Sequence, residues 1–462
     1  MSAHAGGGGP TAGPRRPAGA GVAGEIAEVD VEALGADGRA LVAIAGETFS
    51  VDGVLVGERV LVRAHRGRRG RRRADLVEVL EASSERVPPV CPHFGVCGGC
   101  RFQHMPAGAQ RALKQQQLLD ALDAQGGIAP ERLLEPLCGP TTGYRRRARL
   151  GVKFVPAKGG ALVGFRERAS AKLAELSSCA VLEPRIGEAI GALRALVDRL
   201  DARRRVPQLE VAMGDRETAL VVRHLDPLCG RDRAVLEAFA RERAWQIHLQ
   251  AGGPESIEPL WPRTPPPLAY ALPEFDLELE FLPTDFVQVN GAMNRALVGA
   301  AIRHLDPTPA SRVLDLYCGI GNFTLAVARR ARTVIGVEGD AALVERARGN
   351  ARRNRLDHVE FVAADLSNFD AGASWWRPTP DRVLLDPPRT GAAHVLEALC
   401  EPLPERLVYV SCNPESFARD ARLLVREKGY RLTCARLVDM FPHTAHCESL
   451  AVFEHRGRAP AR

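Results

Sequence analysis

The 462-residue sequence predicts an α/β protein in which a doubly wound, mainly parallel sheet follows two smaller, strand-rich segments. Beyond the proline-rich stretch at 260–273, apolar runs alternate with helix-like segments. Near the N-terminus, short β-like runs are separated by turns, and the middle of the chain combines hairpins with helices. We therefore expect a disordered tail and three folded domains, at 1–21, 22–85, 86–272 and 273–458 respectively.

The composition favours a protein of the cell interior. Apolar residues make up 45% of the chain, enough for real cores, and the net charge is +6. No apolar run is long enough to cross a membrane, and no apolar signal core is present, so we expect a cytoplasmic protein. The 11 cysteines follow no secreted pattern, which favours reduced thiols, metal ligation or catalysis over disulfides.

Five β-like runs between residues 24 and 82 indicate a small barrel of the OB-like kind. Seven arginines lie between Arg63 and Arg73, between the last two of these runs. Such a density of positive charge favours an anionic polymer over a small acid as the binding partner, although a solvated loop can have the same composition.

A cysteine motif, CPHFGVCGGCRFQH, follows the barrel. Cys91, Cys97 and Cys100 form C-x5-C-x2-C, and the glycines let the backbone wrap around a compact group. The spacing favours a metal over three unrelated thiols, and leaves zinc and an iron-sulfur cluster open. It differs from the C-x3-C-x2-C expected for radical chemistry, so we expect a structural or RNA-positioning site.

Three thiolates need a fourth ligand. Cys179 is the first candidate and Cys138 the second, whereas His93 or His104 could ligate zinc instead.

The middle segment predicts two hairpins and two helices. The hairpins pair 143–155 with 161–170 and 208–214 with 217–225, and the helices span 107–125 and 186–202. Period-two alternation places Arg145, Arg147 and Arg149 on one face of the first hairpin, with Lys153 further along. This row could follow phosphates or could be an exposed polar face, and the two interpretations have equal weight.

The C-terminal region predicts seven strands. Their apolar runs lie at 312–316, 333–338, 359–365, 381–386, 406–412, 435–440 and 449–455. The loop DLYCGIGNFT follows the first strand, with Gly319 and Gly321 allowing close backbone approach and Glu338 placed to hold ribose hydroxyls. Thr324 occupies the third glycine position of the dinucleotide pattern. The loss of that glycine argues against NAD as the cofactor and favours S-adenosylmethionine.

Acidic residues also end the third and fourth strands, at Asp365 and Asp386. One such carboxylate could simply cap a helix, but three at successive strand ends favour a ligand site. Cys412 lies at the carboxyl end of a central strand, where open α/β sheets place their crevices. A lone cysteine there is otherwise most often a small buried hydrophobe.

The stretches FLPTDFVQVN, LDLYCGIGNFTL, VLLDPPRTG, VYVSCNPESFARD and DMFPHTAHCES together closely resemble the RNA uracil-5-methyltransferases that depend on S-adenosylmethionine. CPHFGVCGGC and a barrel similar to the TRAM kind point to the bacterial branch that acts on 23S ribosomal RNA. The resemblance runs from the barrel nearly to the C-terminus.

The resemblance implies a 4Fe-4S cluster, a set of cofactor contacts, and 23S ribosomal RNA as partner, with a target equivalent to U1939. The sequence does not reveal the oligomeric state, for which a monomer is our working expectation. The implied cluster ligands are Cys91, Cys97, Cys100 and Cys179. The implied contacts to S-adenosyl-L-methionine are Gln288, Tyr317, Asn322, Glu338, Asp365 and Asp386. Tyr317 stands where close relatives look to carry Phe, so an aromatic face is retained.

The chemistry of this family assigns two further roles. Cys412 is expected to add to carbon 6 of uracil, and Glu448 to remove the carbon 5 proton after methyl transfer. Cys447 and Cys318 are rival thiols, and His446 could be purely structural. The alternatives are 5-methyluridine formation at another RNA site, methylation of cytosine through a similar adduct, and a non-catalytic iron-sulfur protein that binds RNA.

Overall fold

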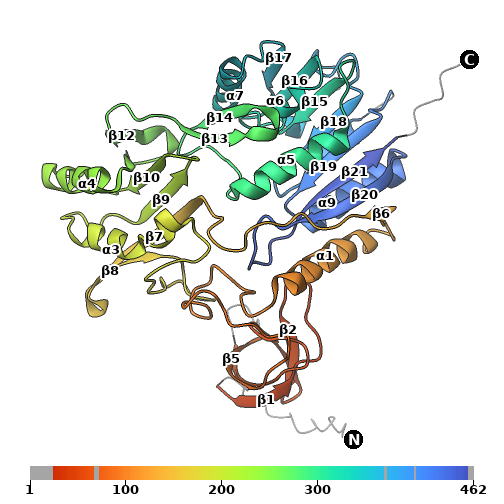
Figure 1. Cartoon of the computed structure of the whole chain (residues 1–462). Coiled ribbons are helices and arrows are strands. Elements are labelled where there is room, and N and C mark those ends of the chain that lie inside the picture. Colours follow the sequence, from red (N-terminus) through yellow and green to blue (C-terminus); the bar gives the residue numbers. More distant parts are fainter. Residues whose placement is uncertain (1–23, 67–71, 369–371, 400–401, 456–462) are drawn as a thin grey trace, which may run out of the picture. The chain divides into compact units, whose positions relative to one another are not determined.

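The computed structural model describes residues 24–66, 72–368, 372–399 and 402–455 (Figure 1). The chain divides into two compact units, Met1–Arg86 and Val87–Arg462, each with its own core. The tail predicted at 1–21 and the centre of the arginine run, 67–71, lie outside the described residues.

The first unit is a five-stranded sheet in the order β1-β4-β5-β3-β2. Its strands are β1 (Ile26–Asp30), β2 (Ala40–Ile44), β3 (Glu47–Val51), β4 (Arg59–Arg66) and β5 (Arg72–Glu81). Every pairing is antiparallel except that between β3 and β5. Alternate residues of β2 are buried, as the period of a strand requires, so the strands curve around a small apolar core (Figure 1).

The second unit contains a mixed sheet of six strands in the order β12-β11-β10-β9-β7-β8. The strands are β7 (Arg147–Val155), β8 (Gly160–Gly164), β9 (Gln208–Met213), β10 (Thr218–Arg223), β11 (Gln246–Gln250) and β12 (Ile257–Trp261). Both predicted hairpins form, as β7–β8 and β9–β10. Helices α3 (Ile190–Asp198) and α4 (Gly230–Arg243) accompany this sheet.

The helix predicted at 186–202 is broken into α2 (Pro184–Gly187) and α3, and it ends earlier than expected. The break coincides with a contact outside the helix, because the carbonyl of Gly187 accepts a hydrogen bond from Cys179 N at 2.9 Å. A Cβ atom at Gly187 would lie 2.4 Å from the Cys179 carbonyl oxygen, so only glycine allows this close approach.

The large sheet of the second unit has eight strands in the order β17-β16-β15-β18-β19-β21-β20-β6. All seven predicted strands form: β15 (Arg312–Leu316), β16 (Thr333–Glu338), β17 (Val359–Ala363), β18 (Arg382–Leu385), β19 (Arg406–Ser411), β20 (Arg431–Val438) and β21 (Glu448–Glu454). The first five are parallel, and β21 runs antiparallel to both of its neighbours. The carboxyl ends of β15, β16, β18 and β19 therefore meet at one edge.

Helices cover both faces of this sheet (Figure 1). One face carries α5 (Gly291–Leu305), α6 (Thr324–Ala328), α7 (Ala341–Arg353) and the hairpin of β13 (Leu268–Leu272) and β14 (Leu277–Phe281). The other carries α1 (Ala107–Asp123), α8 (Ala393–Glu397) and α9 (Pro414–Arg422).

The sheet extends beyond the predicted range of 273–458. The strand β6 (Arg132–Leu133) joins its edge beside β20, and α1 packs on α9. The β13–β14 hairpin straddles residue 273. None of the described helices has the length and apolar character needed to cross a membrane.

Candidate active site

A cavity of about 590 Å³ lies at the carboxyl ends of the parallel strands. It collects residues from five loops of the large sheet and from the segment that precedes α5. Seven of the eight residues predicted for methyl transfer or cofactor binding line it, namely Gln288, Tyr317, Asn322, Glu338, Asp386, Cys412 and Glu448.

The loop after β15 is held against the end of β16. The backbone amides of Tyr317 and Cys318 both donate to the carbonyl of Val337, at 2.9 and 3.1 Å. Tyr317 and Gly319 have positive φ angles of 66° and 54°, which for Tyr317 is a costly left-handed conformation. The loop is thereby folded tightly enough for a ligand to approach its backbone.

Glu338 is oriented by this loop. One carboxylate oxygen accepts a hydrogen bond from Gly319 N and the other from Asp340 N, both at 3.1 Å. The side chain remains half-buried at the rim of the cavity, with acceptor capacity left for hydroxyl groups.

Asn322 lines the cavity, but its amide group already has partners. Its Oδ1 accepts bonds from Tyr270 Oη at 2.9 Å and Asn294 Nδ2 at 3.0 Å, and its Nδ2 donates to Asn294 Oδ1 at 2.9 Å. We did not predict Tyr270 or Asn294 as site residues. Their partner lies 52 and 28 residues away in the chain, so no local pattern marks them.

Asp365 lies apart from the other predicted residues. Its exposed carboxylate accepts bonds from Ser367 N, Ser367 Oγ and Asn368 Nδ2 at 2.9, 2.6 and 2.9 Å, and it is not among the cavity-lining residues. It caps the short 3-10 helix Leu366–Asn368, the alternative role that a strand-end carboxylate can have. Its contact with the cofactor stays a prediction.

Cys412 directly follows β19, and Glu448 is the first residue of the neighbouring antiparallel strand β21. The antiparallel pairing of β19 with β21 ends with Ser411 opposite Ser449, and Cys412 and Glu448 are the next residues on each side. Both side chains line the cavity, and the charge of Glu448 acts on the Cys412 thiol. The sheet therefore presents a thiol and a carboxyl group side by side to the cavity.

Burial controls the charges of this pair. Burial raises the pKa of Cys412, and Glu448 and Asp386 raise it further, whereas Arg389 lowers it. Burial raises the pKa of Glu448 well above its usual value, and Asp386 adds to this shift. Both groups favour their protonated forms until a cation enters the cavity.

The rival thiols also line the cavity but are differently engaged. Cys447 Sγ donates to the carbonyl of Lys114 at 3.4 Å, and burial raises its pKa to about 12. Cys318 is 4% exposed, and burial raises its pKa well above the usual value. Cys412 is half-buried, so of these three it is the thiol most open to a substrate.

Arg389 and His446 form a pair at the rim. Arg389 Nη2 donates to His446 Nδ1 at 2.8 Å, and burial followed by the charge of Arg389 lowers the pKa of His446. His446 is thus a neutral acceptor that orients Arg389. Phe286, which we did not single out, lines the same cavity with 70% of its surface exposed, an unusual exposure for a large aromatic ring.

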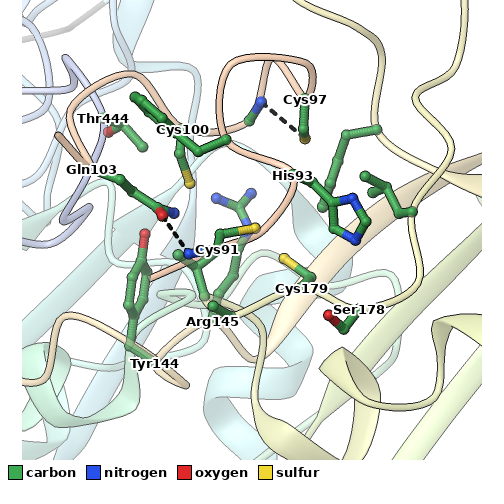
Figure 2. A pocket seen from close by; sticks show the side chains of 16 residues that line it. Cys91, His93, Cys97, Cys100, Gln103, Tyr144, Arg145, Ser178, Cys179 and Thr444 are labelled. Carbon is green, nitrogen blue, oxygen red and sulfur yellow. Dashed lines mark hydrogen bonds between the residues drawn. The ribbon is translucent and has the colours of Figure 1, made fainter. Parts of the chain in front are cut away.

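The second predicted site is a cavity of about 220 Å³ lined by Cys91, Cys97, Cys100 and Cys179. Figure 2 shows their sulfur atoms around one space. Burial raises the pKa of Cys97 and Cys179, and raises that of Cys100 to about 12. Thiols so buried become thiolates only beside a compensating positive charge, such as that of a metal.

The alternative ligands fit this cavity less well. Cys138 is exposed, and neither it nor His104 is among the lining residues. His93 lines the cavity, but its Nε2 accepts a hydrogen bond from Ser177 N at 3.1 Å. The structure therefore groups the four cysteines that the family resemblance implied.

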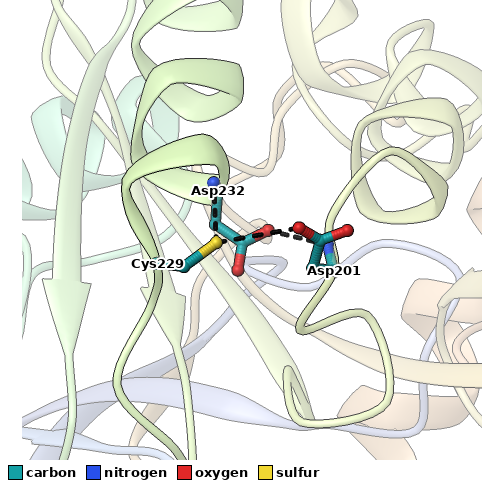
Figure 3. Close-up of side chains that lie close together, drawn as sticks. All are labelled: Asp201, Cys229 and Asp232. Atoms are coloured by element: carbon teal, nitrogen blue, oxygen red, sulfur yellow. Dashed lines mark hydrogen bonds between the residues drawn. The ribbon is translucent and has the colours of Figure 1, made fainter.

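A further group of possible ligands, Asp201, Cys229 and Asp232, caps α4 (Figure 3). Cys229 Sγ accepts from Asp232 N at 3.5 Å, while Asp232 Oδ1 accepts from Asp201 N at 2.7 Å. Arg231 forms an ion pair with Asp201. These contacts explain the group without an ion.

The arginine row of β7 is partly neutralised, because β9 places Glu210 beside it. Arg147 Nη2 and Arg149 Nε contact the two oxygens of Glu210 at 2.8 and 3.2 Å, and the Arg147 side chain is only 13% exposed. Arg145 Nε donates to the carbonyl of Arg147 at 3.0 Å. Two of the three arginines in this row are thus paired with Glu210, while the Arg149 side chain stays 72% exposed.

Known proteins share this sequence and fold. The family model described as tRNA (Uracil-5-)-methyltransferase matches residues 274–456. The structure of Pyrococcus abyssi tRNA (uracil-54, C5)-methyltransferase in complex with S-adenosyl-L-homocysteine has a TM-score of 0.72 with 24% identity, covering 92% of this chain and 99% of that chain. At that identity the likeness concerns the fold.

Two curated relatives match nearly their full length. The 23S rRNA (uracil(1939)-C(5))-methyltransferase RlmD of Xanthomonas oryzae pv. oryzae (strain MAFF 311018) is 49% identical over 92% of this chain and 96% of the relative. The protein of the same name from Alkalilimnicola ehrlichii is 48% identical over 93% and 97%. This chain therefore belongs to the RlmD family of 23S rRNA (uracil(1939)-C(5))-methyltransferases.

Proposed function

We propose that this chain transfers a methyl group from S-adenosylmethionine to carbon 5 of a uridine in 23S ribosomal RNA, at the position equivalent to that named for its relatives. The observation that carries the proposal is that Cys412 and Glu448, at the adjoining ends of the paired strands β19 and β21, line the same large cavity. A nucleophile and a base at neighbouring positions are what methylation of an unreactive ring carbon requires.

The two residues act in sequence. The Cys412 thiolate adds to carbon 6 of the uracil, and the electron pair of the 5,6 double bond moves toward carbon 5 and the carbonyl at carbon 4. S-adenosylmethionine supplies an electrophilic methyl group, which carbon 5 receives as the sulfonium loses it. Glu448 then removes the carbon 5 proton, the double bond re-forms, and Cys412 leaves as a thiolate.

The rim of the cavity suits the cationic cofactor. We assign its contacts to Gln288, Tyr317, Asn322, Glu338, Asp365 and Asp386. Glu338 can accept bonds from ribose hydroxyls, and Asp386 lies in the same cavity as Cys412 and Glu448. A bound sulfonium charge would lower the pKa of both reacting groups, so the cofactor prepares the pair for catalysis.

The nucleophile is tested by Cys412→Ala, with Cys138→Ala as the control because Cys138 is exposed and outside both cavities. We expect Cys412→Ala to bind S-adenosylmethionine normally, to form no 5-methyluridine and to lose the covalent adduct with 5-fluorouracil RNA. Analysis of the nucleoside product distinguishes 5-methyluridine from 5-methylcytidine. Normal turnover by Cys412→Ala would refute the mechanism.

We also propose that Cys91, Cys97, Cys100 and Cys179 hold a 4Fe-4S cluster. A single zinc ion about 2.3 Å from four sulfurs leaves no room between them, whereas a cavity of about 220 Å³ accommodates a group of several atoms. The expected result is iron and inorganic sulfide in the anaerobically purified protein, and their loss in Cys100→Ser. A zinc-loaded, fully active preparation would rule the cluster out.

The remaining parts are proposed to bind RNA. The five-stranded first unit, which we take as a TRAM-like barrel with its arginine run, and the cysteine-containing region would hold the ribosomal RNA while the target base is turned out of its stack. The division of the chain at 22–85, 86–272 and 273–458 remains our working description of these parts.

A further inference from the structure

The segment between β20 and β21 carries Glu448 at its end and has unusually many partners from distant parts of the chain. Tyr144 Oη donates to the Pro442 carbonyl at 3.0 Å, and Asn290 Nδ2 donates to the Met440 carbonyl at 3.2 Å. We call residues 439–447 the base turn, because its geometry decides where Glu448 points.

Lys114 of α1 contacts this turn at its beginning, middle and end. Its Nζ donates to Asp439 Oδ1 at 2.7 Å and to the Phe441 carbonyl at 2.9 Å, and its own carbonyl accepts from Cys447 Sγ at 3.4 Å. Lys114 and Asp439 are 1% and 2% exposed. A buried ion pair is costly to form, so its presence here indicates a role in specifying this geometry.

Gln110 lies four residues before Lys114 on α1 and forms two hydrogen bonds with His443, at the centre of the base turn. Its Oε1 accepts from His443 N at 2.8 Å, and its Nε2 donates to His443 Nδ1 at 3.2 Å. His443 has a φ of 66°, a left-handed conformation that a residue with a side chain keeps only when its surroundings enforce it.

The cysteine loop holds the same residue. Arg101 N and Phe102 N, directly after Cys100, donate to the His443 carbonyl at 2.7 and 3.0 Å. Thr444 lines the cysteine cavity, whereas His446 and Glu448 line the large one, so the base turn is the wall between the two cavities. Gln110 and Lys114 are the side chains of α1 that fix this wall.

We propose that Gln110 and Lys114 are positioning residues that hold the base turn so that Glu448 reaches the carbon 5 proton. The proposal rests on the role of Glu448 in the proposed function. The residues that hold the cofactor come from other loops, so a loosened turn should impair the last proton transfer and spare cofactor binding. A displaced base leaves the methylated RNA attached to Cys412, because the thiol cannot leave before the proton does.

Two variants loosen the turn in different ways. Gln110→Met keeps the volume of the side chain and removes its hydrogen bonds. The double variant Lys114→Met with Asp439→Leu removes both buried charges together, which avoids leaving one of them unpaired. Gln116→Ala is the matched control, because Gln116 lies on the same helix and its amide donates to the exposed Asp120.

The decisive measurement is the fraction of RNA in a denaturation-resistant adduct with the protein during turnover. We expect both loosened variants to accumulate methylated adduct, with kcat reduced about 10- to 100-fold, as a misplacement near 1 Å produces, and with unchanged binding of S-adenosylmethionine. The control should behave as the wild type. Thermal unfolding of each variant, followed by circular dichroism, establishes that the protein is folded.

Glu448→Gln separates the two levels of the hypothesis. If Glu448→Gln itself accumulates no adduct, the role of Glu448 in the proposed function is wrong and this inference falls with it. If Glu448→Gln accumulates adduct while both loosened variants turn over normally, only the inference is wrong. Loss of activity without adduct in the folded variants would also overturn it, because the defect would then precede proton removal.

Discussion

Three carboxyl groups, two buried and one partly buried, lie at the carboxyl edge of the large sheet. Asp315, Asp386 and Glu448 are charged only at a cost, and Asp315 Oδ2 accepts a bond from Thr324 Oγ1 at 2.5 Å. Burial raises the pKa of Asp315 to about 7, with Asp386 among the further causes, and burial raises the pKa of Asp386 to about 7. Such a cluster stores electrostatic strain that a cationic ligand relieves.

Asp386→Asn should therefore stabilise the cofactor-free protein. The pKa of Asp386 is raised from 3.8 to about 7, so the folded state loses stability as pH rises from about 4 to 7. We expect the amide variant to exceed the wild type in free energy of unfolding at pH 8 by a few kcal/mol, at about 1.4 kcal/mol per pKa unit.

The gain should be small near pH 4, where the Asp386 carboxyl of the folded wild type is protonated, and Asp386→Asn should bind S-adenosylmethionine more weakly than the wild type at pH 8. Urea unfolding at both pH values and calorimetric titration measure the two effects. A stability difference that is the same at pH 4 and pH 8 would contradict the assigned burial cost.

The thiol of Cys412 responds to the arginine beside it. Burial raises its pKa, Glu448 and Asp386 add to the shift, and Arg389 opposes it. Because the thiolate is the nucleophile, adduct formation with 5-fluorouracil RNA should rise with pH, and Arg389→Gln should move this rise to higher pH. The pH dependence of adduct formation is the measurement.

Arg422→Gln is the control, because Arg422 is an exposed arginine on α9. It should leave the profile in place. An unshifted profile for Arg389→Gln would show that Arg389 does not act on the thiol.

At the scale of elements, α1 closes one face of the large sheet although it lies more than two hundred residues before α9. Leu118 and Leu122 are fully buried in the same cluster as Tyr409 and Phe417. The apolar face of α1 thus completes the core that supports the strand bearing Cys412.

Leu118→Ala should lower the free energy of unfolding by about 2–5 kcal/mol, because it leaves a cavity in a core that relaxes only in part. Gln116→Ala on the exposed side of α1 should change it by less than about 0.5 kcal/mol. Urea unfolding monitored by tryptophan fluorescence gives both values. Equal effects of the two substitutions would mean that α1 does not belong to this core.

The elements predicted with success are those with long local patterns. The seven strands of the large sheet and both hairpins contain apolar or alternating runs that local periodicity identifies. β6 has only two residues, too few for such a pattern. β13 lies inside the proline-rich stretch, and we did not predict β14 although its sequence LELEF alternates as a strand does. The break at Gly187 depends on the distant Cys179 and is invisible in a helical pattern.

At the scale of the whole molecule, the two compact units have separate cores. The core of the first unit contains only residues before Arg86, and the three others contain only residues after it. The first unit can therefore be removed without cutting through either cavity.

The fragment Val87–Arg462 should fold and bind S-adenosylmethionine as the full chain does, because both cavities lie within it. It lacks the arginine run, so its affinity for ribosomal RNA should fall, and the salt dependence of binding should become shallower by about 0.7–0.9 for each phosphate that the fragment no longer neutralises. Filter binding across a salt series measures this. If the fragment and the full chain show the same salt dependence of RNA binding, the first unit does not contribute to the RNA-binding surface.

The sequence by itself determined the seven strands of the large sheet, both hairpins, the glycine loop and the C-x5-C-x2-C motif, while the family resemblance supplied Cys179 as fourth ligand and the roles of the pair proposed for catalysis. These features depend on periodicity or on motifs within a short stretch of chain. Only the tertiary structure decided that Asp365 caps a short helix, that Asn322 is bound by Tyr270 and Asn294, and that Lys114 holds Asp439.

The physical reason is the distance along the chain. Lys114 and Asp439 are 325 residues apart, and their pairing follows from the packing of α1 on the sheet rather than from any local preference. Cys412 and Glu448 are likewise separated in the chain. Their residue types suggest the chemistry, but it is the pairing of β19 with β21 that brings them close together.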